Sequence, residues 1–147
     1  MKEKAQIILE SRLTNNFYSR FSIGDTIDFY FDGFMLIAQD IQSDYEKDLN
    51  KIFKENYKFY DSSIDKENMS KSSIIASAMR QPITKVELQE EGTLILVFKN
   101  EIQIVLLTST RIVDWQWALN KDGRDPNWGN GYEVCCFFKN DVRVNEY

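Results

Sequence analysis

The sequence predicts a single α+β domain over residues 1–147. An antiparallel sheet of about five to seven strands, arranged as a meander of hairpins, packs against one long helix and one or two short ones. The length of 147 residues is typical of one domain with its own core. Most apolar residues alternate with polar ones between turn residues, which is typical of strands. Residues 43–59 instead repeat apolar side chains at helical spacing.

The first element is a short amphipathic helix at the N-terminus. Residues 3–13, EKAQIILESRL, place Ile7, Ile8 and Leu13 among charged side chains. This spacing favours a helix, with a strand as the alternative.

A β-hairpin follows from Gly24. Residues 27–32, IDFYFD, alternate apolar and polar side chains, and Asp32-Gly33 then supplies a tight turn before the chain returns as FMLIAQDI. Alternation puts Asp28, Tyr30 and Asp32 on the outward face of the strand.

The long helix is expected over residues 43–59. Ser43 and Glu46 have capping-box spacing, and apolar residues then recur every three or four positions. Residues 60–71 are polar and predict a loop, while residues 72–80 predict a short helix that Pro82 ends.

Beyond Pro82 the pattern is β to the end of the chain. Phe98-Lys99-Asn100 and Phe138-Lys139-Asn140 each close a strand and turn it, so the repeated FKN is an architectural feature of two hairpins. The expected strands are ITKVEL, TLILVF, EIQIVLLTST, RIVDWQWAL, YEVCCFF and DVRVNEY, with a Gly/Asn/Asp/Pro loop over residues 120–131.

Two pairs of neighbouring side chains bear on the predicted core. Trp115 and Trp117 share one face of their strand, and their area favours burial over a stacking surface. Cys135 and Cys136 are adjacent in a strand and point to opposite faces, so we expect two reduced thiols, one in the core and one outside.

The chain has no histidine, which removes several kinds of chemistry. Without it there is no Ser-His or Cys-His nucleophile pair, no His base and no Cys/His zinc cluster. The sequence therefore predicts a non-enzymatic protein with no cofactor and no metal ligands. No apolar run approaches the ~20 residues that span a bilayer, so we expect a cytoplasmic protein without membrane contact.

Negative charge is concentrated in residues 24–48, where seven carboxylates face Lys47 alone, a net charge of −6 in a chain whose total is −5. Such a run is either a solvated face or a surface that steers a basic partner. The aromatic loop 120–133 is a second candidate surface, and the absence of a basic groove argues against nucleic acid. The candidate partner-binding residues are Asp25, Asp28, Tyr30, Asp32, Asp40, Asp44, Asp48, Asp122, Asp125 and Trp128.

A hairpin motif and a following strand resemble a known family. The motif consists of Gly92, Leu94, Leu96, Phe98, Asn100 and Ile104, and the strand DWQWAL precedes a Gly-rich loop. Over residues 83–147 the chain resembles immunity proteins of bacterial polymorphic-toxin and contact-dependent growth inhibition systems. The resemblance implies stoichiometric binding of a cognate toxin domain, often a basic nuclease, without turnover.

Two other classes remain open from sequence. One is an adaptor or structural module with a peptide partner. The other is a metal-dependent hydrolase that uses Asp28, Asp32 and Asp40, although carboxylates four residues apart on a strand lie roughly 13 Å apart. The sequence predicts no particular oligomeric state.

Overall fold

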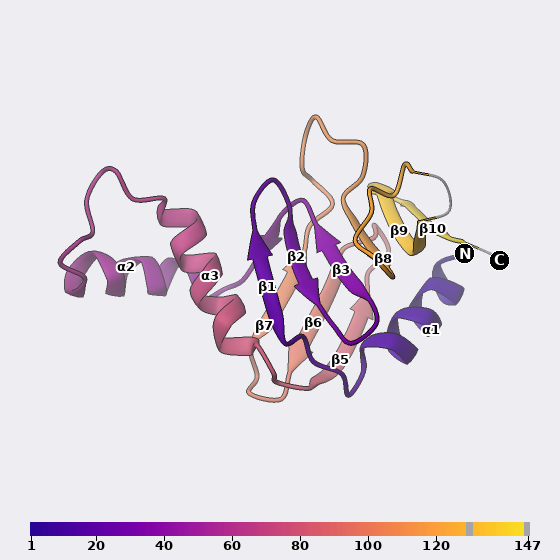
Figure 1. Cartoon of the computed structure of the whole chain (residues 1–147), viewed down its shortest axis with the longest axis horizontal. Helices are drawn as coiled ribbons and strands as arrows, with labels where there is room; N and C mark the ends of the chain where they lie inside the picture. Colours follow the sequence, from indigo (N-terminus) through magenta and orange to yellow (C-terminus); the bar gives the residue numbers. More distant parts are fainter. Residues whose placement is uncertain (129–130, 146–147) are drawn as a thin grey trace.

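The computed structural model describes residues 1–128 and 131–145, and within them it contains three helices and ten strands. The predicted α+β class with antiparallel pairing is confirmed (Figure 1). The helices are α1 (Lys2–Leu13), α2 (Glu46–Asn56) and α3 (Lys66–Ala78). The strands are β1 (Arg20–Ile23), β2 (Ile27–Tyr30), β3 (Met35–Ala38), β4 (Ile41–Gln42), β5 (Ile83–Leu88), β6 (Leu94–Phe98), β7 (Gln103–Leu106), β8 (Trp117–Asn120), β9 (Tyr132–Phe138) and β10 (Asp141–Val144).

The strands divide into two sheets, where the sequence predicted a single meander. The larger sheet has the order β1-β2-β3-β8-β9-β10, and the smaller has the order β4-β7-β6-β5. The chain crosses between them after β3, because β3 ends at Ala38 in one sheet and β4 begins at Ile41 in the other. Side chains from both sheets form one buried cluster, and Figure 1 shows β1–β3 lying over β5–β7.

Tyr18 joins the two sheets and α3. Its ring makes edge contacts with Phe29 of the larger sheet at 5.0 Å and with Phe98 of the smaller sheet at 5.8 Å. Its hydroxyl donates to the carbonyl oxygen of Ile75 at 2.6 Å, which satisfies the buried polar group. Burial raises the pKa of this phenol, so it stays protonated.

The N-terminal helix is confirmed, but with a different apolar face. α1 buries Ala5, Leu9 and Leu13 at four-residue spacing, while Ile7 is 66% exposed. The side-chain amide of Gln6 donates through Nε2 to the Val86 carbonyl and accepts at Oε1 from the Leu88 N–H. α1 is therefore hydrogen-bonded along the edge strand β5. This contact covers the edge of β5, whose first residue, Ile83, is hydrogen-bonded by Asn15 and Asn16.

β8 begins later than predicted, and this changes the faces of the tryptophans. The strand starts at Trp117, so Trp115 and Gln116 precede it, and the Gln116 N–H donates to the Cys136 carbonyl at 2.8 Å. The prediction of one shared face is therefore wrong: Trp117 lies in the main core, and Trp115 lies in a second cluster on the opposite side of the larger sheet. Both are buried, as expected.

The second cluster also corrects the expectation for the cysteines. Cys136 lies in the main core and Cys135 lies beside Trp115, so both free thiols are buried. Burial raises the pKa of Cys136 to about 12 and raises that of Cys135 further. Neither thiol is ionised near neutral pH.

The hairpin turns agree with their sequences. Gly33 and Gly92 have φ values of 81° and 99°, in the left-handed region, and Asn140 has 67°. In the hairpin after Phe98 the left-handed residue is Glu101, at 71°, one position after the predicted Asn100. The FKN repeat thus forms two hairpins with different loops.

Candidate functional site

α2 and α3 form an arm beside the sheets, on the far side from α1 (Figure 1). α2 packs against α3 and buries none of its own residues. It begins at Glu46 and ends at Asn56, shorter than the predicted 43–59, because Ser43 takes part in a turn in which its hydroxyl accepts from the Tyr45 N–H at 3.4 Å. No helix in residues 1–128 and 131–145 is long and apolar enough to cross a membrane.

α3 corrects the predicted loop over residues 60–71. Asp65 caps the helix by accepting from the Asn68 N–H at 3.1 Å, and the helix runs from Lys66 to Ala78. The first half of α3 is polar, so the sequence shows no apolar periodicity there that would predict a helix. Its second half is anchored by Ile74 and Ile75 in the core.

Lys71 is the charged centre of the arm. It is only 4% exposed, and its Nζ donates to Asp40 Oδ1 at 2.5 Å and to Glu67 Oε1 at 2.6 Å. Burial by itself lowers the pKa of Lys71, but the hydrogen bonds to the two carboxylates outweigh it, and the pKa is raised. Lys71 is therefore a fixed cation.

Glu46, at the start of α2, faces the same centre. Burial raises the pKa of its carboxyl, Lys71 lowers it, Asp40 and Glu67 raise it, and a backbone hydrogen bond from Ser43 lowers it. The net result is a raised pKa. The buried Oε1 atom of Glu46 has no hydrogen-bond partner in the described protein, and the same holds for the Ser70 hydroxyl on α3.

A polar cavity of about 530 Å³ opens between the two helices, and we term it the α2–α3 cleft. Its lining residues are Gln42, Ser43, Asp44, Glu46, Lys47, Asn50, Lys66, Glu67 and Ser70. An adjacent apolar pocket of about 310 Å³ lies where α2 meets the rest of the domain. It is lined by Tyr45, Asp48, Leu49, Ile52, Ile74, Ser77 and Ile102.

Three of the predicted partner-binding residues belong to this region. Asp44 lines the α2–α3 cleft, Asp48 lines the apolar pocket, and Asp40 holds Lys71. They come from a turn, a helix and the segment before β4, and the fold brings them to one arm.

The residues predicted on the first hairpin lie elsewhere. Asp25 and Asp32 are exposed turn residues at opposite ends of β2. Asp28 accepts from the hydroxyl of Thr26 at 2.7 Å, and the Arg20 guanidinium lies 4.1 Å from the centre of the Tyr30 ring. Side chains on the outward face of this hairpin thus contact partners within the hairpin. The acidic residues of segment 24–48 are divided between the hairpin and the arm.

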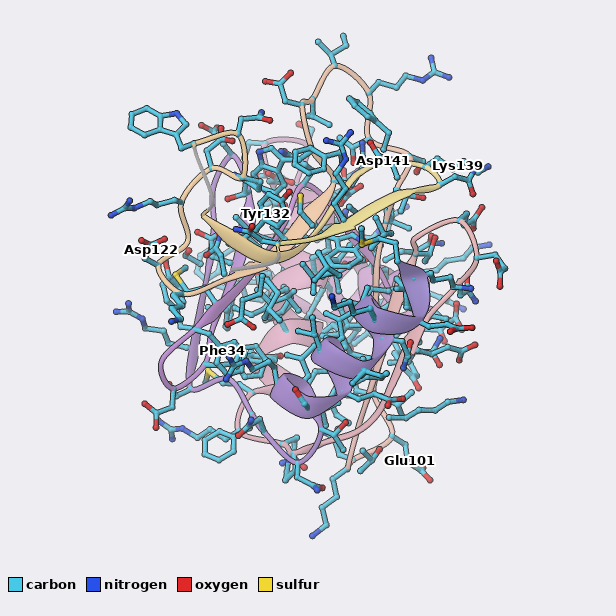
Figure 2. The ribbon with its side chains drawn as sticks, turned by 90° about the vertical axis from the view of Figure 1, so that its right-hand side faces the viewer. Phe34, Glu101, Asp122, Tyr132, Lys139 and Asp141 are labelled. Carbon is cyan, nitrogen blue, oxygen red and sulfur yellow. The ribbon has the colours of Figure 1, made fainter. Side chains whose placement is uncertain are left out.

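The β8–β9 loop holds the remaining candidates. Asp122 pairs with Arg124 at 2.8 Å, and Asp125 accepts from the Asn127 N–H at 2.8 Å. Trp128 is 76% exposed. Figure 2 shows Asp122 at the periphery of the molecule, away from Asp141. Residues 129 and 130 of this predicted surface lie outside the described residues.

The hydrolase alternative requires carboxylates that converge. In residues 1–128 and 131–145 there is no group of three or more His, Cys, Asp or Glu side chains that could hold a metal ion. Asp28, Asp32 and Asp40 in particular lie in a strand, a hairpin turn and the Lys71 cluster.

Comparison of the chain with protein-family models, curated proteins and solved structures finds no match.

The sequence does not predict all the side chains that complete the cleft. Glu67 and Ser70, with the neighbouring Lys71, lie in the segment predicted as a loop, and Glu46 is predicted as a capping residue and as one of the seven carboxylates of residues 24–48. A usable signal was present in Asp65, which precedes Glu67 in the way that a cap precedes an acidic first turn.

Proposed function

We propose that the protein is an immunity protein that binds a basic toxin domain through the α2–α3 arm and neutralises it. The observation that supports this most strongly is the set of carboxylates gathered on the arm beside exposed apolar side chains. The set consists of Asp44, Glu46, Asp48 and Glu67 around the cleft and the adjoining pocket, and in the cleft lining three carboxylates stand against Lys47 and Lys66.

The two pockets have complementary roles in such an interface. Acidic side chains raise the association rate of a basic partner, and apolar side chains supply most of the binding free energy. Tyr45 and Ile52 are 43% and 52% exposed and line the apolar pocket, and Asp44 and Glu46, on either side of Tyr45 in the chain, line the α2–α3 cleft. A partner with a basic surface and an exposed apolar side chain therefore fits both the cleft and the apolar pocket.

Affinity capture tests this proposal. The chain is immobilised and exposed to extract of the cell that produces it, at low salt, alongside a variant with Asp44→Lys and Asp48→Lys. We expect a stoichiometric partner with a basic domain that binds the natural chain, fails to bind the variant, and elutes as salt shortens the Debye length from ~10 Å at 0.1 M to ~3 Å at 1 M. A capture pattern that is the same for both chains contradicts the proposal.

The apolar pocket also favours the second candidate function, an adaptor that holds a peptide. Its lining from α2, α3 and Ile102 resembles a groove for an amphipathic segment. Toxicity separates the two functions. An equimolar amount of an immunity protein abolishes the growth arrest caused by its captured partner, whereas an adaptor leaves the activity of its partner unchanged.

A further inference from the structure

We propose that the α2–α3 cleft is a binding site for one arginine side chain of the partner, whose guanidinium donates to the Glu46 carboxylate and the Ser70 hydroxyl. This inference rests on the proposed function, since it names the group by which a basic partner is recognised. It concerns the interior of the cleft, not the general charge of the arm.

The Ser70 hydroxyl is the first observation that carries it. α3, which lies wholly in the described part of the chain, contains four serines. The hydroxyls of Ser72, Ser73 and Ser77 each donate to the carbonyl four residues earlier, at 2.5, 2.9 and 2.7 Å. Ser70 is 3% exposed, lines the cleft and makes no such bond. A buried hydroxyl without a partner is costly unless a ligand supplies one.

Glu46 is the second observation, and it comes from the opposite helix. Its Oε1 atom is buried without a partner, although the side chain lines the same cavity as Ser70. The nearby Lys71 ammonium donates to Asp40 and Glu67, and no hydrogen bond from it to Glu46 forms in the described structure. Two side chains that line one cavity from two helices thus each carry a buried polar atom without a partner.

The chemistry of the lining selects a guanidinium. Its five N–H donors match several acceptors in one plane, and it is more weakly hydrated than an ammonium, so it enters a partly buried site more readily. Asn50 and Asp44 add further acceptor oxygens at the lining. Lys47 and Lys66 also line the cleft, and the Lys66 ammonium lies 5.6 Å from the centre of the Tyr60 ring. A cavity of about 530 Å³ has room for the side chain.

Three small probes test this site by NMR titration of the ¹⁵N-labelled chain: Nα-acetylarginine amide, its neutral isostere with citrulline, and the lysine counterpart. We expect the arginine probe to shift the amide signals around Glu46 and Ser70, with citrulline inactive and lysine weaker. Glu46→Gln should weaken arginine binding about tenfold, and Ser70→Ala about two- to tenfold. Glu55→Gln, on α2 outside the lining, is the matched control and should bind as the natural chain does.

Failure of this inference is distinct from failure of the proposed function. Absence of localised shifts at roughly 10 mM arginine probe, or equal affinity of the natural chain and Glu46→Gln, overturns the arginine site even if a basic partner is captured. A bound arginine probe with no basic partner leaves the site in place and contradicts the immunity function instead.

Discussion

Lys71 and Asp40 join the arm to the point where the chain passes from one sheet to the other. The Nζ of Lys71, on α3, lies 2.5 Å from Oδ1 of Asp40, which stands between β3 and β4. Glu67, one turn earlier on α3, shares the same ammonium. A single buried cation therefore links α3 to the crossing between the sheets and bonds to Glu67, which lines the α2–α3 cleft.

Replacing Lys71 with Met should destabilise the protein. The change leaves carboxylates in a partly buried setting without their cation, and we expect a loss of about 1–3 kcal/mol, reduced from the value for a fully buried pair because Asp40 is partly exposed. Urea denaturation measures it. Lys66→Met, at an exposed position, should stay within about 0.5 kcal/mol of the natural chain. Equal stability of both variants counts against the structural role of Lys71.

Glu46→Gln should give a pH-dependent gain in stability. Because the folded pKa of Glu46 is raised above 4.5, ionising this group costs more in the folded state than in the unfolded state. Stability from the protonated carboxyl is therefore present below pH 4.5 and is lost as the pH rises through the folded pKa. The groups that face it are Lys71, Asp40, Glu67 and Ser43.

Denaturation of the natural chain and of Glu46→Gln, from below pH 4.5 to neutral pH, tests whether the variant becomes the more stable of the two as the pH rises. The variant does not ionise, so its advantage should appear above pH 4.5 and then level off. A variant that is less stable than the natural chain at neutral pH contradicts the assigned environment of Glu46.

Trp117→Ala should be strongly destabilising. Trp117 is fully buried, and its indole Nε1 donates to the Gly92 carbonyl at 2.8 Å, so the substitution leaves a cavity and an unpaired oxygen. We expect a loss of about 3–5 kcal/mol by calorimetry or denaturation. Trp128→Ala, on an exposed loop residue, is the control and should change stability by less than about 0.5 kcal/mol. Similar effects of the two substitutions would show that the core is wrongly assigned.

The two cysteines should be inert in the folded protein. Both thiols are buried and their pKa values are raised, so little thiolate forms at pH 8. A chromogenic disulfide reagent should titrate neither thiol in the native state and both in denaturant. Rapid reaction of either one under native conditions contradicts the burial of β9.

Local sequence patterns predicted the elements whose signals are local. Alternation and turn residues predicted the hairpins around Gly33, Gly92 and Asn140, and the positive φ values at these residues are the physical reason. The division into two sheets depends on the crossing after Ala38. Strand pairing is a long-range choice that alternation within a strand does not encode.

The cleft was predictable only in part. Asp44, which lines the cleft, is predicted together with the nearby Asp40 and Asp48 because the three are close in sequence and carry the same charge. Ser70 and Lys71 come from a helix whose exposed half is polar, so no apolar period marked it, and their burial follows from the packing of α3 against α2. The start of β8 at Trp117, which leaves Trp115 outside the strand and in the second cluster, likewise has no local sequence marker.

Two double charge reversals test most directly whether the arm binds the basic partner. Asp44→Lys with Asp48→Lys alters the arm, and Asp28→Lys with Asp32→Lys alters the first hairpin by the same net charge, so general electrostatic attraction is matched. The dissociation constant of the captured partner is measured for each chain by calorimetry, with circular dichroism confirming the fold. We expect the hairpin variant to bind as the natural chain does, and the arm variant to bind about 100-fold more weakly because like charges then meet in the interface. Loss of binding in the hairpin variant, with full affinity in the arm variant, would contradict the account and assign the interface to the hairpin.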